Sequence, residues 1–283
     1  MALQRDLLDH YKCVTYVCNK RFMLLLMFLD YAVEPFYYER GINFYEDGQN
    51  YALASLLYAV GPAILGDGAL DRLLFKFQRA VKEKSEDALA DLVQVARTCH
   101  WRELPEALGP LAQFAAPECL QAIATPGVNT DATLVVLQSL ISRMEAMAEG
   151  PYRVEHDQSK ALLTYHEFLQ RYISHDDVAT FRQSEIATIS FPLKLQAVKQ
   201  VDSKASPAVQ LADIMIGAAI EAANSLKNGR AGALDPFKVL SLYADHQLIH
   251  MFPSIDFEAQ KRFRAGSQAA EVIDYFTANF HKQ

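Results

Sequence analysis

Apolar residues recur every three to four positions through the middle of the chain, a spacing typical of amphipathic helices. The clearest example is 70–82, where Leu73, Leu74 and Phe77 share one helical face. Glycine and proline residues separate the helical segments. We therefore expect residues 36–150 to contain helices and no strand. The same spacing predicts helices over 22–31, 51–65, 70–82, 87–96, 103–115, 118–124 and 132–148.

Alternating apolar and polar residues on both sides of this block predict strands. Within 152–157, Tyr152 and His156 point to one side of the strand, and the charged residues between them point to the other. β-Branched and aromatic residues at 13–22, and alternation within 191–204, predict two further strands.

Helices are also expected around these strands. Ser206 followed by Pro207 predicts a helix start, because serine is a preferred N-cap and proline suits the first helical position. The pattern as a whole predicts an α/β core with a mixed sheet, formed by residues 1–34 and 151–283 and interrupted by a helical insertion at 35–150. The expected helices in the core are 3–12, 159–171, 207–223, 236–250 and 257–280, the last broken near Gly266.

Composition and charge narrow the class of protein. The net charge of −7 argues against a surface coated with basic groups for nucleic acid, although it leaves room for a local basic groove. The longest apolar run, 22–29, is too short to span a bilayer, and charged residues precede it, so we expect neither a membrane protein nor a signal peptide. The four cysteines form no C-x-x-C pair. These features predict a cytoplasmic protein with reduced thiols.

Two aspartates follow predicted strands, where functional side chains of α/β sheets gather. Asp157 ends one strand, and the simpler alternative for it is a helix N-cap. Asp202 ends the next strand, with a solvated turn residue as the alternative.

Asp213 lies in an otherwise apolar helical segment, with Val209, Ile216 and Ile220 on its stripe. A buried carboxylate there needs a compensating partner. A buried salt bridge or a surface position would explain it, and so would ligation of a divalent metal together with Asp157. With Asp202, the three acids suit Mg²⁺- or Mn²⁺-dependent phosphodiester hydrolysis, in which carboxylates hold the ions that activate water.

Weaker candidates accompany these acids. Arg72, Lys76 and Arg79 form a basic stripe, which is either a phosphate-contacting surface or a solvated helix face. His246 and His250 have the spacing of a zinc pair on a helix, with packing or surface histidines as the alternative. A further pair of acids one helical turn apart, Asp30 and Glu34, indicates either a solvated helix end or a fourth acid.

Two segments resemble a known family. "VEHDQSK" at 154–160, and "VDSKASPAVQLADIMIGAAIEAA" at 201–223, resemble the bacterial and phage family known as domain of unknown function 3800 (DUF3800), in which a D-S-K-like turn precedes a helix containing Q-L-A-D. The family is similar to the ribonuclease H-like superfamily. The resemblance implies a mixed sheet flanked by helices and a metal-dependent nuclease site, in which Asp157 and Asp213 are metal ligands and Asp202 matches the D-S-K turn.

The family's usual opening strand, with its D-E-S-G-like motif, has no counterpart in this chain, and Asn19 stands where an acid often ends the next strand. The function expected is therefore a metal-dependent nuclease that is degenerate or N-terminally truncated. The alternative is a non-catalytic interaction protein, or a subunit of a phage-defence or mobile-element system. Loss of a central strand would leave a sheet edge open to a second copy or a partner subunit.

Overall fold

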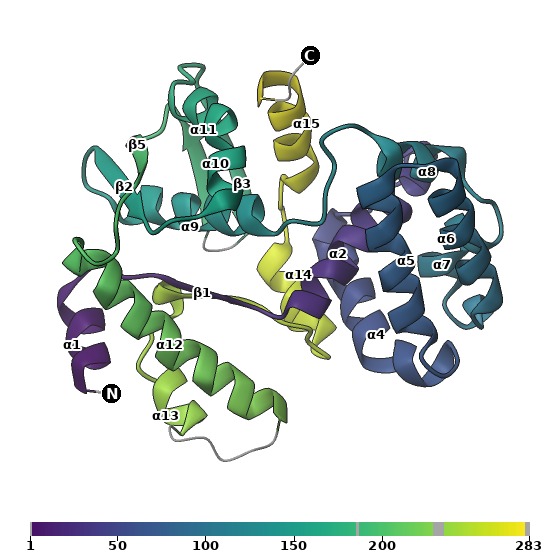
Figure 1. The fold of residues 1–283 in the computed structure, drawn as a ribbon, viewed down its shortest axis with the longest axis horizontal. Helices are drawn as coiled ribbons and strands as arrows, with labels where there is room; N and C mark the ends of the chain where they lie inside the picture. Colours follow the sequence, from purple (N-terminus) through teal and green to yellow (C-terminus); the bar gives the residue numbers. More distant parts are fainter. Residues whose placement is uncertain (1, 185–186, 229–234, 281–283) are drawn as a thin grey trace. The chain divides into compact units, whose positions relative to one another are not determined.

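The computed structural model describes residues 2–184, 187–228 and 235–280. The chain is mostly helical and has small sheets of two strands each. Its contacts divide it into two compact units (Figure 1). The strand unit comprises Met1–Val17, Thr133–Met251 and Glu271–Gln283, and the helical unit comprises Cys18–Ala132 and Phe252–Ala270.

This division falls at other residues than those predicted for the core and the insertion. The first long apolar helix, α2 (Lys20–Ala32), belongs to the helical unit, as does α14 (Phe257–Arg264). The last helix of the predicted insertion, α9 (Thr133–Met147), belongs to the strand unit, where it packs against the strand hairpin described below.

The helical unit is built from short amphipathic helices around aromatic and leucine side chains. Phe28 and Phe77 are fully buried and meet edge to face, with ring centroids 5.4 Å apart. Residues 36–150 are all described and contain helices and turns but no strand, as their periodicity predicts. The remaining elements of this unit are α3 (Glu34–Tyr38), the 3-10 turn η1 (Glu46–Gly48), α4 (Gln49–Ile64), α5 (Ala69–Glu83), α6 (Glu86–Thr98), η2 (Trp101–Glu103), α7 (Pro105–Ala112) and α8 (Pro117–Ala124).

The strand unit contains three separate strand pairs among its described residues, and not one continuous sheet. The parallel pair joins β2 (Tyr152–His156) to β5 (Leu195–Gln200). The antiparallel hairpin joins β3 (Ala179–Ser184) to β4 (Ala187–Phe191). The third pair is β1 (Thr15–Cys18) with β6 (Leu248–Met251). The helices of this unit are α1 (Ala2–His10), α9, α10 (Lys160–Thr164), α11 (His166–Ile173), α12 (Pro207–Asn228), α13 (Pro236–Leu240) and α15 (Ala269–Phe280), with the 3-10 turn η3 (Asp245–Gln247).

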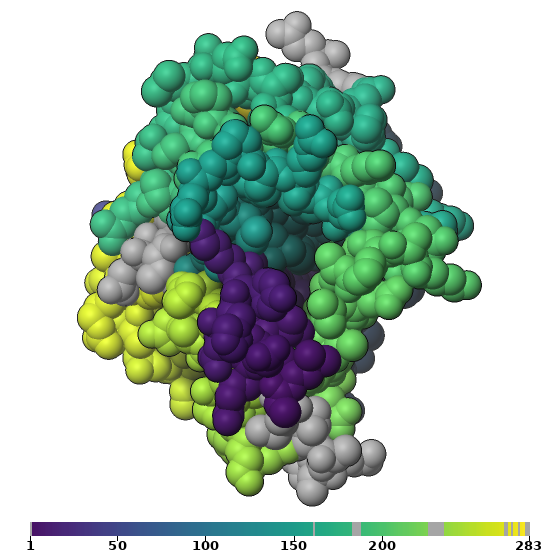
Figure 2. Space-filling view, turned by 90° about the vertical axis from the view of Figure 1, so that its left-hand side faces the viewer, coloured from purple at the N-terminus to yellow at the C-terminus, as the bar shows by residue number. Residues whose placement is uncertain are grey.

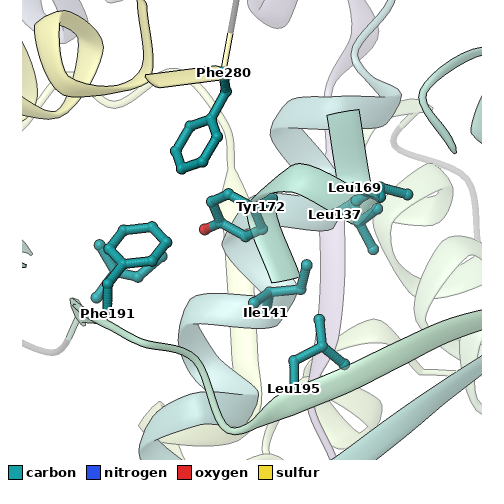
Figure 3. Packing of buried hydrophobic residues seen from close by; sticks show 8 residues of the cluster. Leu137, Ile141, Leu169, Tyr172, Phe191, Leu195 and Phe280 are labelled. Atoms are coloured by element: carbon teal, nitrogen blue, oxygen red, sulfur yellow. The ribbon is translucent and has the colours of Figure 1, made fainter. Parts of the chain in front are cut away.

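The core of the strand unit is an aromatic cluster from α9, α11, β4, β5 and α15. Tyr172 and Phe280 face one another at its centre, with ring centroids 5.4 Å apart (Figure 3). Phe191 of β4 meets Tyr172 edge to face at 5.3 Å. Burial of these rings fixes the hairpin, α11 and the C-terminal helix against one another.

Several sequence predictions hold in this unit, and two need correction. A strand forms within each of the three predicted segments, at 15–18, 152–156 and 195–200, although 20–22 of the first segment is helical. In the helical unit, the predicted break near Gly266 separates α14 from α15. The hairpin β3–β4 was not predicted, although Ile189 and Phe191 are buried and Thr188 and Ser190 are exposed, which is the alternation of a half-buried strand. The predicted helix at 236–250 ends ten residues early, at Leu240.

The early end of that helix has a tertiary cause. Gln247, buried at the end of η3, donates from Nε2 to the backbone carbonyl of Leu8 at 2.8 Å and accepts from the backbone N–H of Ala244. These bonds hold the chain in an extended path, and β6 then pairs with β1. A partner distant in sequence therefore overrides the local helical pattern.

Candidate functional site

β2 and β5 form a parallel pair (Figure 1). Two of the predicted acids come just after the carboxyl ends of these strands. His156 at the end of β2 is aligned with Gln200 at the end of β5, and the backbone N–H of Val201 donates to the carbonyl of His156 at 2.9 Å. Asp157 directly follows His156, and Asp202 follows Gln200 after one intervening residue, Val201. Because the strands are parallel, both aspartates lie beyond their carboxyl ends, the usual position of ligand-binding groups in α/β sheets.

Asp157 is exposed, and its carboxylate is not used as a helix cap. The N-cap of α10 is Ser159, whose Oγ accepts the backbone N–H of Leu162 at 3.2 Å, so the N-cap alternative for Asp157 is wrong. The neighbouring ring nitrogen Nδ1 of His156 hydrogen-bonds to the backbone carbonyl of Asp157 at 2.6 Å. The carboxylate of Asp157 is therefore available to a ligand from solvent.

Asp202 is exposed and forms a turn. Its Oδ1 accepts the backbone N–H of Lys204 at 3.0 Å, and the backbone carbonyl accepts the N–H of Ala205. This is the hydrogen bonding of a turn residue, as the simpler alternative for Asp202 stated. This hydrogen bond uses one lone pair of Oδ1. Because Asp202 is exposed, the other lone pairs of its carboxylate remain open to a ligand from solvent.

The same turn starts α12 close to the end of β2. Ser206 accepts the backbone N–H of Val209 and donates from Oγ to Glu155 Oε2, each at 3.4 Å. The predicted N-cap and the predicted helix are thus confirmed, and α12 extends to Asn228. The N-terminal end of α12 carries a positive partial charge, which favours an anion near the strand edge.

The expectation that Asp213 is a buried carboxylate is wrong. It is exposed, together with Leu211, Ile214, Ile216 and Ile220 on the same helix, and Ile214 retains 52% of its surface and Ile220 48%. The buried side of α12 carries Met215, which packs on Leu7 and Leu8 of α1. Figure 2 shows the mid-green residues of α12 at the surface beside the purple α1. Asp213 is a surface carboxylate, the alternative that the sequence left open.

The predicted basic stripe lies in the helical unit and is largely paired. Lys76 Nζ and Arg79 Nη1 of α5 both contact Asp91 Oδ2 of α6, at 2.7 and 3.0 Å, and Arg79 Nε also contacts Glu83 at 3.0 Å. Hydrogen bonding from Lys76, assisted by the Arg79 charge, lowers the pKa of Asp91. Arg72, the third residue of the stripe, is exposed. Two of the three cations therefore already have a carboxylate partner within their unit.

The predicted histidine pair does not lie on a helix. His246 is in η3 and His250 is in β6, so the four-residue spacing does not place the two rings on one helical face, and this interpretation is wrong. Among the described residues, no group of three or more His, Cys, Asp or Glu side chains is placed to hold a metal ion. A cation at the strand edge would thus have two aspartates as protein ligands.

Two further acids are shielded from solvent in the structure: Glu145 was not among the predicted site residues, and Asp30 was a weaker candidate. Glu145 of α9 is buried and accepts two backbone N–H groups at the start of β5. Asp30 of α2 has its Oδ1 atom shielded from solvent and without a hydrogen-bond partner. Burial raises the pKa of Asp30 to about 7. The only sequence signal for Asp30 is its place in the apolar segment 22–31, and the prediction of a solvated helix end is wrong for it.

None of the helices in the described part of the chain combines the length and apolar character needed to cross a membrane. The chain has no match among protein-family models, curated proteins or solved structures. The resemblance to DUF3800 and its ribonuclease H-like relatives stays a prediction from the quoted segments.

Proposed function

We propose that the chain is a divalent-metal-dependent phosphodiesterase acting on nucleic acid, with its site at the carboxyl ends of β2 and β5. The observation that supports this proposal is that Asp157 lies one residue, and Asp202 two residues, beyond the aligned ends His156 and Gln200, at the same end of the parallel pair. The proposal retains the nuclease function expected from sequence. It replaces Asp213 with Asp202 as the partner of Asp157 in holding the metal.

The donor set fits Mg²⁺ or Mn²⁺. Mg²⁺ is commonly held by one or two carboxylates, with water and substrate phosphate oxygens completing its shell, and both aspartates are open to solvent. When bound, the ion supplies an activated water and neutralises charge on the phosphate. Asp157 and Asp202 would bind and orient it, and the N-terminal end of α12, held by Ser206, would favour the incoming phosphate.

The test is metal-dependent cleavage of single-stranded and double-stranded DNA and RNA by the full chain. We expect cleavage with Mn²⁺ or Mg²⁺ that is reduced about 100-fold or more by Asp157→Asn or Asp202→Asn, since each variant removes a charged ligand. Asp176→Asn, which changes an exposed acid of the same unit, is the matched control and keeps full activity. Absence of cleavage by the wild-type chain, or equal cleavage by Asp157→Asn and Asp176→Asn, would contradict the proposal.

Asp213→Asn decides whether α12 contributes a further ligand, as the sequence resemblance implies. We expect this variant to keep the stability of the metal-free chain, because the side chain is exposed. Loss of the Mn²⁺-dependent rise in melting temperature in Asp213→Asn would assign the side chain to the metal. An unchanged rise would remove it from the ligand set.

The second candidate is a non-catalytic subunit that pairs with a second copy of the chain. Two observations favour it: β2 and β5 pair only with one another among the described strands, and α12 exposes four large aliphatic residues. An unpaired strand edge can pair with the same strand of a copy across a two-fold axis. If so, sedimentation will show a dimer that Ile216→Ser with Ile220→Ser converts to a monomer, and a monomeric wild-type chain contradicts this candidate.

A further inference from the structure

Phe114 presents an aromatic ring at the surface of the helical unit. It lies in the turn between α7 and α8, and 53% of its surface is exposed. The ring stacks on Phe36 of α3, with the centroids 5.2 Å apart and the ring planes within 18° of each other. Because Phe36 covers one face of the Phe114 ring, the exposed surface is the opposite face and the edges.

A cation continues this stack on the side of Phe36. The guanidinium carbon of Arg40 lies 3.4 Å from the centroid of the Phe36 ring. Nη1 of Arg40 donates to Oε1 of Glu118 on α8 at 2.9 Å and to the backbone carbonyl of Phe36. These bonds hold the guanidinium over the ring. Arg40, Phe36 and Phe114 thus contact one another in turn, and the last of these three flat groups is open to solvent.

The turn that carries Phe114 is held by its own backbone. The N–H of Ala115 donates to the carbonyl of Leu111 at 3.0 Å, and the N–H of Ala116 donates to that of Pro110 at 2.9 Å. Ala115 has φ +44°, a left-handed conformation that is disfavoured for a residue with a Cβ atom. The position of Phe114 at the surface is therefore set by a bonded turn at the end of α7.

An exposed cation reaches the same turn from α6. Nε of Arg97 donates at 3.1 Å to the carbonyl of Ala112, the last residue of α7. No carboxylate of the described chain lies within ion-pair distance of Arg97, whereas Lys76 and Arg79 of the neighbouring α5 share Asp91. The two terminal nitrogens of Arg97 therefore remain as donors for an anion, and a guanidinium suits the oxygens of a phosphate.

We infer that Phe114 and Arg97 form a contact site for single-stranded nucleic acid, in which a base stacks on the open face of Phe114 and a phosphate binds the Arg97 guanidinium. Proteins that bind single strands combine aromatic rings for the bases with cations for the backbone. A base inside a duplex has both faces covered by its neighbours, so only an unpaired base can stack on the ring. The choice of nucleic acid rests on the proposed function, and the inference narrows its substrate to unpaired strands.

The test is fluorescence anisotropy of a labelled deoxythymidine strand of about 12 nucleotides, a length within the usual site size of such proteins. The full chain is used in EDTA at low salt, so that binding is measured without cleavage. We expect the wild-type chain to bind this strand more tightly than a blunt duplex of the same length. Equal affinities for strand and duplex would overturn the inference.

Substitutions of Phe114 separate stacking on a base from packing on Phe36. Phe114→Leu keeps an apolar side chain but loses the flat ring, and we expect it to lower the affinity for the strand about tenfold. Phe114→Tyr keeps the ring and the affinity. Phe75→Leu is the matched control, because Phe75 is a 65% exposed phenylalanine on α5 of the same unit. Equal affinities of Phe114→Leu and Phe75→Leu would show that the ring serves packing alone.

Arg97→Gln tests the phosphate contact. We expect this variant to lower the slope of log affinity against log salt by about one unit, because one ion pair with the backbone is lost. Lys82→Gln is the control, since Lys82 is an exposed cation on α5, and it leaves the slope unchanged. The same slope in wild type and Arg97→Gln would remove Arg97 from the site.

Photo-cross-linking locates the base directly. A strand that carries iodouracil, irradiated with the wild-type chain in EDTA, should attach to the peptide that contains Phe114, as mass spectrometry would show. Attachment only at other peptides counts against the inference. These measurements need no metal, so binding without any metal-dependent cleavage would contradict the phosphodiesterase alone. Cleavage by a chain whose Phe114→Leu variant binds the strand normally would contradict this site alone.

Discussion

Glu145 joins α9 to the first residues of β5. Its Oε2 accepts the backbone N–H of Lys194 and its Oε1 that of Leu195, both at 2.9 Å. The Lys194 ammonium in turn donates to the backbone carbonyls of Glu145 and Ala148, at 2.9 and 2.7 Å. Both carboxylate oxygens are thus used, and the strand that carries Asp202 is attached at its start by a buried charge.

We expect Glu145→Gln to destabilise the strand unit by about 2 to 4 kcal/mol, because the amide group cannot accept both N–H groups and leaves one of them buried without a partner. Urea unfolding followed by far-UV circular dichroism measures the change. Glu149→Gln is the matched control, since that carboxylate is exposed and pairs with Lys12 at the surface. Equal stability of the two variants would show that the bonds to β5 contribute little.

At the scale of elements, α5 and α6 of the helical unit pack against one another. Ser85 caps α6 by accepting the backbone N–H of Ala88 at 3.3 Å, and Lys84 before it has φ +53°, which ends α5. Asp91 of α6 then faces the basic side of α5 and contacts two of its cations. To bind phosphate, Lys76 and Arg79 would have to give up their ion pairs with Asp91.

If the stripe binds nucleic acid, Asp91→Asn should strengthen that binding, because Lys76 and Arg79 lose their shared partner. We expect a several-fold higher affinity for a duplex at low salt and a steeper decrease of affinity with salt, by about one to two units of slope. Fluorescence anisotropy over a salt series measures both. Lys76→Glu with Arg79→Glu should have the opposite effect, and identical affinities for all variants would leave α5 a structural face.

For the whole molecule, the division into two units has a consequence for unfolding. Each unit has buried aromatic residues of its own, Phe28 and Phe77 in the helical unit and Tyr172 and Phe191 in the strand unit. Cooperative unfolding follows the contacts of a core, so local stability can differ between the units.

We expect Phe77→Leu to lower the protection of helical-unit amides and Phe191→Leu to lower that of strand-unit amides, each by about 1 to 3 kcal/mol in native-state hydrogen exchange. Each variant serves as the control for the other, since both replace a buried phenylalanine by leucine. Equal losses in both units from either substitution would instead identify the whole chain as one cooperative unit.

The sequence alone determined the helices and several of their ends. The 3.6-residue spacing of apolar residues fixed the helical nature of 36–150, and Ser206 with Pro207 fixed the start of α12. Alternation at 152–157 fixed β2. These features depend on side chains within one turn or one strand of each other, so the local pattern contains the information needed.

Only the tertiary structure decided which polar groups are buried and which strands pair. Asp213 looked buried because its own helix is apolar, yet no described element covers that side of α12. Asp30 looked like a solvated helix end, yet its Oδ1 atom is shielded from solvent. β6 forms because Gln247 bonds to Leu8, far away in the sequence. Burial and strand pairing depend on contacts with segments far away in the sequence. The local spacing of apolar residues does not show which distant segment will make these contacts.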